Sequence, residues 1–182
     1  MNTKPLLLLD FDGVVNFFAS RSAYGKQDAF GYLKRNAYRG YNINWSAELV
    51  SRLNVAKAKY DFEWLWLSTW KDLTQLWVDP TLHSHSDGFV EWDTDSGFTK
   101  DTRPSEIEDT RNKRKYAKVL ELLSENPRPV VWVDDSAAVE YNPSDFVGKL
   151  NIPHLVVKPD ANYGLLKSDY TSMVNFWDTL AA

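Results

Sequence analysis

Three apolar runs, each followed directly by acidic or hydroxyl side chains, constrain the fold of this chain more than any other feature. The runs are Leu6–Leu9, Phe62–Leu67 and Val130–Val133, and a shorter one lies at Leu155–Val157. Glu63 is the only polar residue in them, so they do not alternate as half-exposed strands do. Such runs are typical of strands that are buried on both faces of a parallel sheet.

Three amphipathic segments separate or follow these strands. Residues 46–60, 111–126 and about 168–180 each place apolar side chains on one face at helical spacing. Ser46 is the expected N-cap of the first helix, and Asn126-Pro127 ends the second. Because strands that alternate with helices form right-handed βαβ crossovers, we expect an α/β fold with a doubly wound, mostly parallel, Rossmann-like sheet.

The length of 182 residues is that of one domain. Two stretches, at about 17–42 and 79–105, do not follow the alternation of strands and helices, and we expect them to be inserts. The first is basic and aromatic, with five Lys and Arg against Asp28 alone, and the second is acidic. The first insert is the expected flap or small cap, and neither is long enough for a large cap domain.

Composition limits the chemistry that is open to the chain. It has no Cys and only three His, which excludes disulfides, thiolate zinc sites and a Cys nucleophile and argues against a three-His zinc site. The net charge of −4 argues against a generally basic nucleic-acid-binding protein. No segment approaches the ~20 apolar residues of a membrane span, so we expect a soluble, cytoplasmic protein without a membrane partner. Carboxylates, hydroxyls and Lys are left to carry the chemistry.

Polar residues follow three of the predicted strands and should meet at one edge of the sheet, where ligands of open parallel sheets bind. They are Asp10 and Asp12, Ser68 and Thr69, and Asp134 and Asp135. Four carboxylates that lie close together cannot all ionise cheaply. A divalent cation such as Mg²⁺ would relieve that repulsion, and a Lys from the preceding helix (113, 115 or 118) would complete the charge balance.

These residues resemble the motifs of the haloacid dehalogenase (HAD) superfamily, in the same order along the chain. Asp10-Phe11-Asp12-Gly13-Val14-Val15-Asn16 is similar to the first motif, and Ser68 to the hydroxyl that ends the second strand. Lys115, or alternatively Lys113, is similar to the Lys of the third motif, and Asp134-Asp135 to the acidic pair of the fourth. A second Asp two residues after the first is a feature of the phosphatases and phosphotransferases in the superfamily.

The resemblance implies a phosphohydrolase in which Asp10 forms an aspartyl-phosphate and Asp12 is the general acid and base. Ser68 would then bind a phosphoryl oxygen, and the Lys would neutralise developing charge. It also implies that Mg²⁺ is held by Asp10, the backbone carbonyl of Asp12 and Asp135. Asp134 would orient these ligands.

By analogy with the superfamily, a site without a large cap implies a bulky, nucleotide or nucleic-acid phosphomonoester as the substrate. Thr69 and Trp70 lie beside Ser68, and the basic stretch supplies Lys34 and Arg35, so we expect these residues to contact the substrate. The segments LWLSTW and VVWVDD, with Asp160 and Gly164-Leu165-Leu166, also resemble the small HAD-like domains associated with RNA-repair proteins. The oligomeric state stays open.

Several alternatives accompany these assignments. The fold could serve as a non-catalytic binding module, or act on small metabolites or phosphoproteins. A receiver domain has a similar acidic cluster, but its acidic pair comes first along the chain, whereas here the pair comes last. Asp134 and Asp135 could merely cap a helix, and His83, His85 and Asp87 could bind a metal, although polar loop residues are the simpler interpretation.

Overall fold

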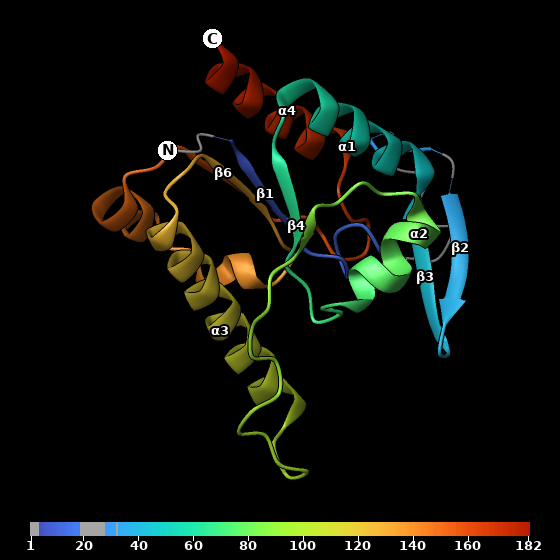
Figure 1. Cartoon of the computed structure of the whole chain (residues 1–182). Helices are drawn as coiled ribbons and strands as arrows, with labels where there is room; N and C mark the ends of the chain where they lie inside the picture. The colour runs from blue at the N-terminus through green and yellow to red at the C-terminus, as the bar shows by residue number, and fades with distance from the viewer. Residues whose placement is uncertain (1–3, 19–27, 32) are drawn as a thin grey trace.

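A five-stranded parallel sheet forms the centre of the molecule. The computed structural model describes residues 4–18, 28–31 and 33–182, without the side chains of residues 147 and 148. The strand order is β5-β4-β1-β6-β7, and each neighbouring pair is parallel. The strands are β1 (Leu6–Leu9), β4 (Glu63–Trp66), β5 (Gly88–Phe89), β6 (Val130–Val133) and β7 (His154–Val157). Helices cover both faces, so the predicted α/β fold is confirmed (Figure 1).

The continuous apolar character of β1 follows from the two helical layers that cover it. Leu7 and Leu9 belong to a core cluster with residues of α1 (Ala47–Tyr60) and α4 (Lys167–Ala181). Leu6 and Leu8 belong to the opposite cluster, which includes residues of α3 (Pro104–Glu125). All four Leu side chains are fully buried, as expected where successive side chains point to opposite faces of a sheet.

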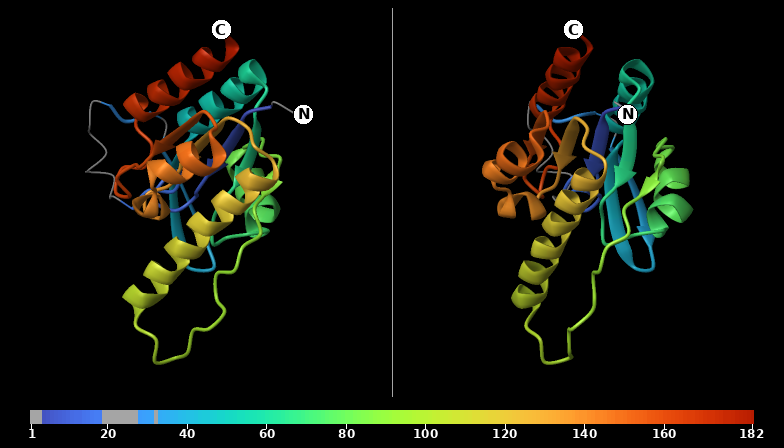
Figure 2. Two further views of the ribbon diagram at one scale, coloured as in Figure 1. Left: turned by 90° about the vertical axis from the view of Figure 1, so that its left-hand side faces the viewer. Right: turned by 60° about the vertical axis from the view of Figure 1, so that its left-hand side comes forward.

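The helices begin and end largely where the sequence predicts. Ser46 caps α1, because its hydroxyl accepts a hydrogen bond from the Leu49 N–H at 3.2 Å. The second predicted helix, α3, begins at Pro104, several residues before the expected start at Arg111. Proline is favoured in the first helical turn, where its missing N–H has no partner to lose. Figure 2 shows the N-terminal part of α3 and the loop before it extending away from the sheet.

The two predicted inserts take different forms. Within the first, β2 (Leu33–Tyr38) and β3 (Tyr41–Ser46) form an antiparallel hairpin that runs directly into α1, four residues beyond the expected boundary at 42. The second contributes β5 to the edge of the main sheet, which the sequence did not indicate, because a two-residue strand has no readable periodicity. The other short helical elements are η2 (Thr74–Val78), α2 (Asp79–Leu82), η3 (Ala137–Glu140) and η4 (Asp145–Leu150).

The order of the strands places a crevice beside the central strand. The chain passes from β1 to β4 and β5 on one side, then returns to β6 and β7 on the other. Ligands of open α/β sheets bind at such a switch point, beyond the carboxyl ends of the strands. No helix in the described part of the chain is long and apolar enough to cross a membrane.

Candidate active site

A buried lysine joins two aspartates at the carboxyl edge of the sheet. Leu9 of β1 is paired with Val133 of β6. Asp10 and Asp134 are the next residues of the two parallel strands, so they lie side by side. The Lys115 ammonium, from the middle of α3, lies 2.7 Å from Asp10 Oδ2 and also pairs with Asp134 Oδ2. All three side chains are at least nine-tenths buried. A charged network at this depth is costly unless its charges compensate one another.

The two members of the acidic pair have different surroundings. Asp134 is fully buried, and its Oδ1 accepts hydrogen bonds from the Ser136 and Ala137 N–H groups at 2.9 and 2.5 Å. It therefore does cap the turn after β6, while its other oxygen pairs with Lys115. Asp135 instead lines a cavity, with its carboxylate against Gly13. Gly13 has φ +73°, and a Cβ there would overlap the Asp135 carboxylate, so this position requires glycine.

Burial and charge perturb the ionisation of this cluster. Burial raises the pKa of Asp10 to about 7, against the opposing effect of Lys115. Burial, followed by the charge of Asp134, raises the pKa of Asp135 to about 6. Burial alone would lower the pKa of Lys115, but the carboxylates of Asp10 and Asp134 outweigh it and raise that pKa. Lys115 thus stays charged, and one ammonium faces three carboxylates.

This donor set fits a hard divalent cation. Asp10, Asp134 and Asp135 each offer a carboxylate oxygen, and these oxygens lie within 4.8 Å of one another. Oxygen ligands and uncompensated negative charge suit Mg²⁺, which binds through a few carboxylates together with substrate phosphate. Asp135 is the most accessible of the three, since it is half-buried whereas Asp10 and Asp134 are buried. Asp134 is also already paired with Lys115 and with two backbone N–H groups.

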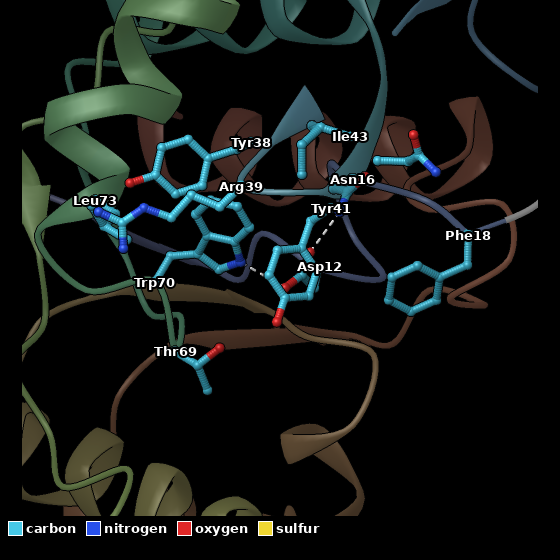
Figure 3. A pocket seen from close by; sticks show the side chains of 11 residues that line it. Asp12, Asn16, Phe18, Tyr38, Arg39, Tyr41, Ile43, Thr69, Trp70 and Leu73 are labelled. Carbon is cyan, nitrogen blue, oxygen red and sulfur yellow. Dashed lines mark hydrogen bonds between the residues drawn. The ribbon is translucent and has the colours of Figure 1, made fainter. Parts of the chain in front are cut away.

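Asp12 lies at the same strand end but faces another group of side chains. Its Oδ2 accepts a hydrogen bond from the indole N–H of Trp70 at 2.7 Å, and its Oδ1 accepts one from the Asn16 amide at 2.6 Å (Figure 3). Asn16 also accepts a hydrogen bond through its Oδ1 from the Asn44 N–H of β3, which ties the hairpin to this turn. The sequence did not single out Asn16, although it is part of the first motif segment.

A cavity of about 550 Å³, which we call the carboxylate cavity, has Asp10, Asp12, Lys115 and Asp135 on its lining. Residues near the N-terminus of α3 line it as well: Pro104, Ile107, Glu108, Arg111 and Asn112. The sequence did not point to these residues, and the first three lie before the predicted start of the helix at Arg111. The cavity thus extends well beyond the carboxylates.

The two hydroxyl residues after β4 differ in access to this cavity. Thr69 lines it, whereas Ser68 is 2% exposed and is not among the described residues on its lining. The Ser68 hydroxyl lies 3.5 Å from the Trp70 N–H. Of these two residues, Thr69 is therefore the one that a ligand in the cavity can contact, and the role of Ser68 stays a prediction.

The structure also separates the candidate lysines. Lys113 is exposed and pairs with Asp109 at 2.9 Å, and Lys118 pairs with Glu121 at 2.6 Å. Lys115 alone among the three reaches the carboxylates, because it lies on the buried face of α3.

A second cavity, of about 570 Å³, lies between the β2–β3 hairpin and the turn that carries Asp12; we call it the hairpin cavity. Trp70 and Thr69 line it, and Figure 3 shows Tyr38, Arg39 and Tyr41 beside them. Lys34 and Arg35 are exposed on β2 and do not line either cavity in the described part of the chain. Four further members of the basic, aromatic stretch lie outside the described residues: Arg21, Tyr24, Lys26 and Tyr32.

The tryptophans are divided between the core and the hairpin cavity. Trp64, Trp66 and Trp132 are fully buried, whereas Trp70 is partly exposed and lines the hairpin cavity.

The His83, His85 and Asp87 segment has structural contacts. Asp87 accepts hydrogen bonds from the Lys57 ammonium at 2.6 Å and the Trp64 N–H at 2.8 Å. Within the described residues, the one cluster of carboxylates that could hold a metal ion is that of Asp10, Asp134 and Asp135.

Comparison with known proteins agrees with the resemblance of the motifs. The family model described as HAD domain in Swiss Army Knife RNA repair proteins matches residues 6–170, which include the whole cluster around Lys115 and both cavities. Among curated proteins, no significant match to the chain was found.

Proposed function

Because the chain belongs to the family of HAD domains found in Swiss Army Knife RNA repair proteins, we propose that it is a Mg²⁺-dependent phosphatase that acts through an aspartyl-phosphate on Asp10. Family membership supports a HAD-type, phosphohydrolase-related role. The observation that carries the finer proposal is the Lys115 ammonium held between Asp10 and Asp134, with Asp135 on the same cavity.

In the first step, a carboxylate oxygen of Asp10 attacks the phosphorus atom of the monoester. The new bond joins Asp10 to phosphorus, and the bond from phosphorus to the leaving oxygen breaks, with its electron pair going to that oxygen. Asp12, in its protonated form, donates a proton to the leaving oxygen, so the product is an alcohol. Lys115 orients Asp10 and balances its charge through the 2.7 Å contact.

In the second step, water attacks phosphorus and the bond to Asp10 breaks. Asp12, now a carboxylate, takes the proton from the water, and inorganic phosphate leaves. The hydrogen bonds from Trp70 and Asn16 hold the Asp12 carboxylate during this exchange. The covalent intermediate divides one difficult displacement into two easier ones.

Asp10, Asp135 and the Asp12 backbone carbonyl would hold Mg²⁺, and Asp134 would orient them. When bound, the cation supplies positive charge that attracts the phosphoryl oxygens and offsets the repulsion between phosphate and carboxylates. The charge balance supports this proposal, because one ammonium faces three buried or half-buried carboxylates.

The proposed substrate is a nucleotide or nucleic-acid phosphomonoester. Two observations support this substrate. Two cavities adjoin Asp12, and the segment Leu33–Ser46 contains Lys34, Arg35 and Arg39 but no acidic residue. Such a basic surface favours the binding of polyanionic ligands.

The test is turnover of a generic aryl phosphate with Mg²⁺ or with EDTA, for the wild type and Asp10→Asn. We expect Mg²⁺-dependent turnover by the wild type and none by Asp10→Asn, because an amide cannot serve as the nucleophile. The matched control is Asp109→Asn, the same change at an exposed carboxylate of α3, which should keep full activity. Circular dichroism checks that the variants are folded. Substantial turnover by Asp10→Asn, or equal and negligible turnover with Mg²⁺ and EDTA, would overturn the proposal.

A further inference from the structure

We propose that the hairpin cavity binds the base of the nucleotide whose phosphate is hydrolysed at Asp10, an inference that rests on the proposed phosphatase function. The cavity volume, about 570 Å³, is within the usual range for small-ligand sites. The hairpin cavity and the carboxylate cavity share Asp12, Phe18 and Thr69. One ligand can therefore place its phosphate in the carboxylate cavity and its base in the hairpin cavity.

Aromatic rings form one wall of the hairpin cavity and are held in place by their neighbours. The Trp70 ring is stacked on Trp77, with 6.0 Å between centroids and 24° between planes. The Tyr38 ring packs against both, at 5.5 Å from Trp70 and 4.8 Å from Trp77. A wall that is already ordered costs little entropy when a flat ligand binds.

Two further rings on the lining are free to stack. Tyr41 is 69% exposed and Phe18 is 58% exposed. Neither ring packs against another aromatic ring that the structure describes. Exposed aromatic rings beside a phosphate site are the arrangement that proteins use to stack nucleobases.

The polar groups of the cavity suit a neutral, planar base attached to an anionic backbone. The Asn42 amide can both donate and accept hydrogen bonds at a base edge. Arg39 adds a cation at the rim, where its guanidinium lies 5.3 Å from the Tyr38 ring centroid. Asp12 is the only carboxylate among the described lining residues, and it is occupied by Trp70 and Asn16.

Trp70 connects the proposed base site to the proposed acid. Its ring lines the hairpin cavity, and its indole N–H donates the 2.7 Å hydrogen bond to Asp12. A base that packs in the cavity therefore contacts the same side chain that donates the hydrogen bond to the Asp12 carboxylate.

The test removes an aromatic ring from the protein and the terminal base from the substrate. The substrates are a short single-stranded oligonucleotide with a terminal phosphate and the same oligonucleotide with an abasic terminal nucleotide, each made with a 3′- or a 5′-phosphate. The variants are Tyr41→Ala, Tyr41→Phe and, as a matched control, Leu76→Ala, which removes an equally exposed side chain (69%) outside the cavity.

We expect Tyr41→Ala to lower kcat/KM for the intact oligonucleotide about tenfold, the usual effect of losing one base–aromatic contact. The abasic substrate should be hydrolysed equally by Tyr41→Ala and the wild type, and Tyr41→Phe should behave as the wild type. Phosphorylated mononucleotides tell whether a free nucleotide suffices or a strand end is required. An equal loss on intact and abasic substrates, or no loss on either, would overturn the proposal.

Failure of the base site and failure of the proposed chemistry give different results. If the wild type hydrolyses the abasic substrate and the base has no effect, the phosphatase proposal survives and the base site is wrong. Titration of the Asp10→Asn variant with the same two oligonucleotides measures binding without turnover. Equal dissociation constants for the intact and abasic strands would again reject the base site.

Discussion

Replacement of Lys115 by Met tests the electrostatic account of the site most directly. Met keeps most of the volume of the side chain and removes its charge, which leaves Asp10 and Asp134 without their shared partner. The three side chains are 5%, 10% and 0% exposed, so solvent cannot replace the lost ammonium. Breaking a pair at such depth costs about 3–5 kcal/mol of unfolding free energy.

The assay is urea unfolding at pH 8 in EDTA, with Lys113→Met as the matched control on the same helix. Lys113 forms an exposed i,i+4 pair with Asp109, so its loss should cost about 0.5 kcal/mol or less. Unchanged m values would show that both variants unfold from comparable states. Mg²⁺ should restore part of the stability of Lys115→Met, because the cation supplies the missing positive charge.

The loss should shrink as the pH falls. The pKa of Asp10 is already raised to about 7 in the folded protein, and removal of Lys115 raises it further. A carboxyl whose pKa is higher in the folded than in the unfolded state destabilises the fold when ionised, and protonation relieves the cost. A loss below about 1 kcal/mol at pH 8, or one equal to that of Lys113→Met, would refute the reasoning.

Two further predictions concern a structural carboxylate and the basic hairpin. Burial raises the pKa of Asp87, but hydrogen bonds from the Lys57 ammonium and the Trp64 N–H outweigh it and lower that pKa. The stabilising effect of the Asp87 carboxylate should therefore be lost as the pH falls toward and below its usual pKa. Asp87→Asn should lower the free energy of unfolding by about 1–2 kcal/mol at pH 7, as measured by urea unfolding. An unchanged midpoint would contradict this. Lys34→Glu with Arg35→Glu should raise KM for a phosphorylated oligonucleotide more than for an aryl phosphate, and an equal effect on both would reject the role in nucleic-acid binding.

The sequence predicts well whatever depends on burial and local spacing. Leu6–Leu9 and Val130–Val133 are strands with the predicted bounds. A short, continuous apolar run is typical of a strand that is covered on both faces of a parallel sheet. The Ser46 cap follows from its hydroxyl and the helical spacing after it. The early start of α3 and the edge strand β5 depend on tertiary contacts, and local pattern does not report those.

The site divides in the same way. Parallel strands bring Asp10 and Asp134 together, since they follow register partners in β1 and β6. The sequence alone does not decide whether Lys113 or Lys115 is the lysine of the site. Both lie on α3, and only the packing of the helix determines which of them faces the sheet. The hydrogen bond from Trp70 to Asp12 depends on side-chain directions after the two strands end, which no spacing rule specifies.

Gly164 and Leu165, which lie outside the four motifs, contact the turn that carries Asp12. Gly164 has φ +63°, and a Cβ there would overlap the Val14 carbonyl, while the Leu165 N–H donates to that same oxygen at 2.9 Å. The turn that presents Asp12 is therefore supported by chain that follows β7. A fragment that ended at Asp135 would contain every proposed catalytic residue and still lack this support. Catalytic competence should consequently appear only once residues 136–182 have folded as well, as a cooperative property of the whole domain.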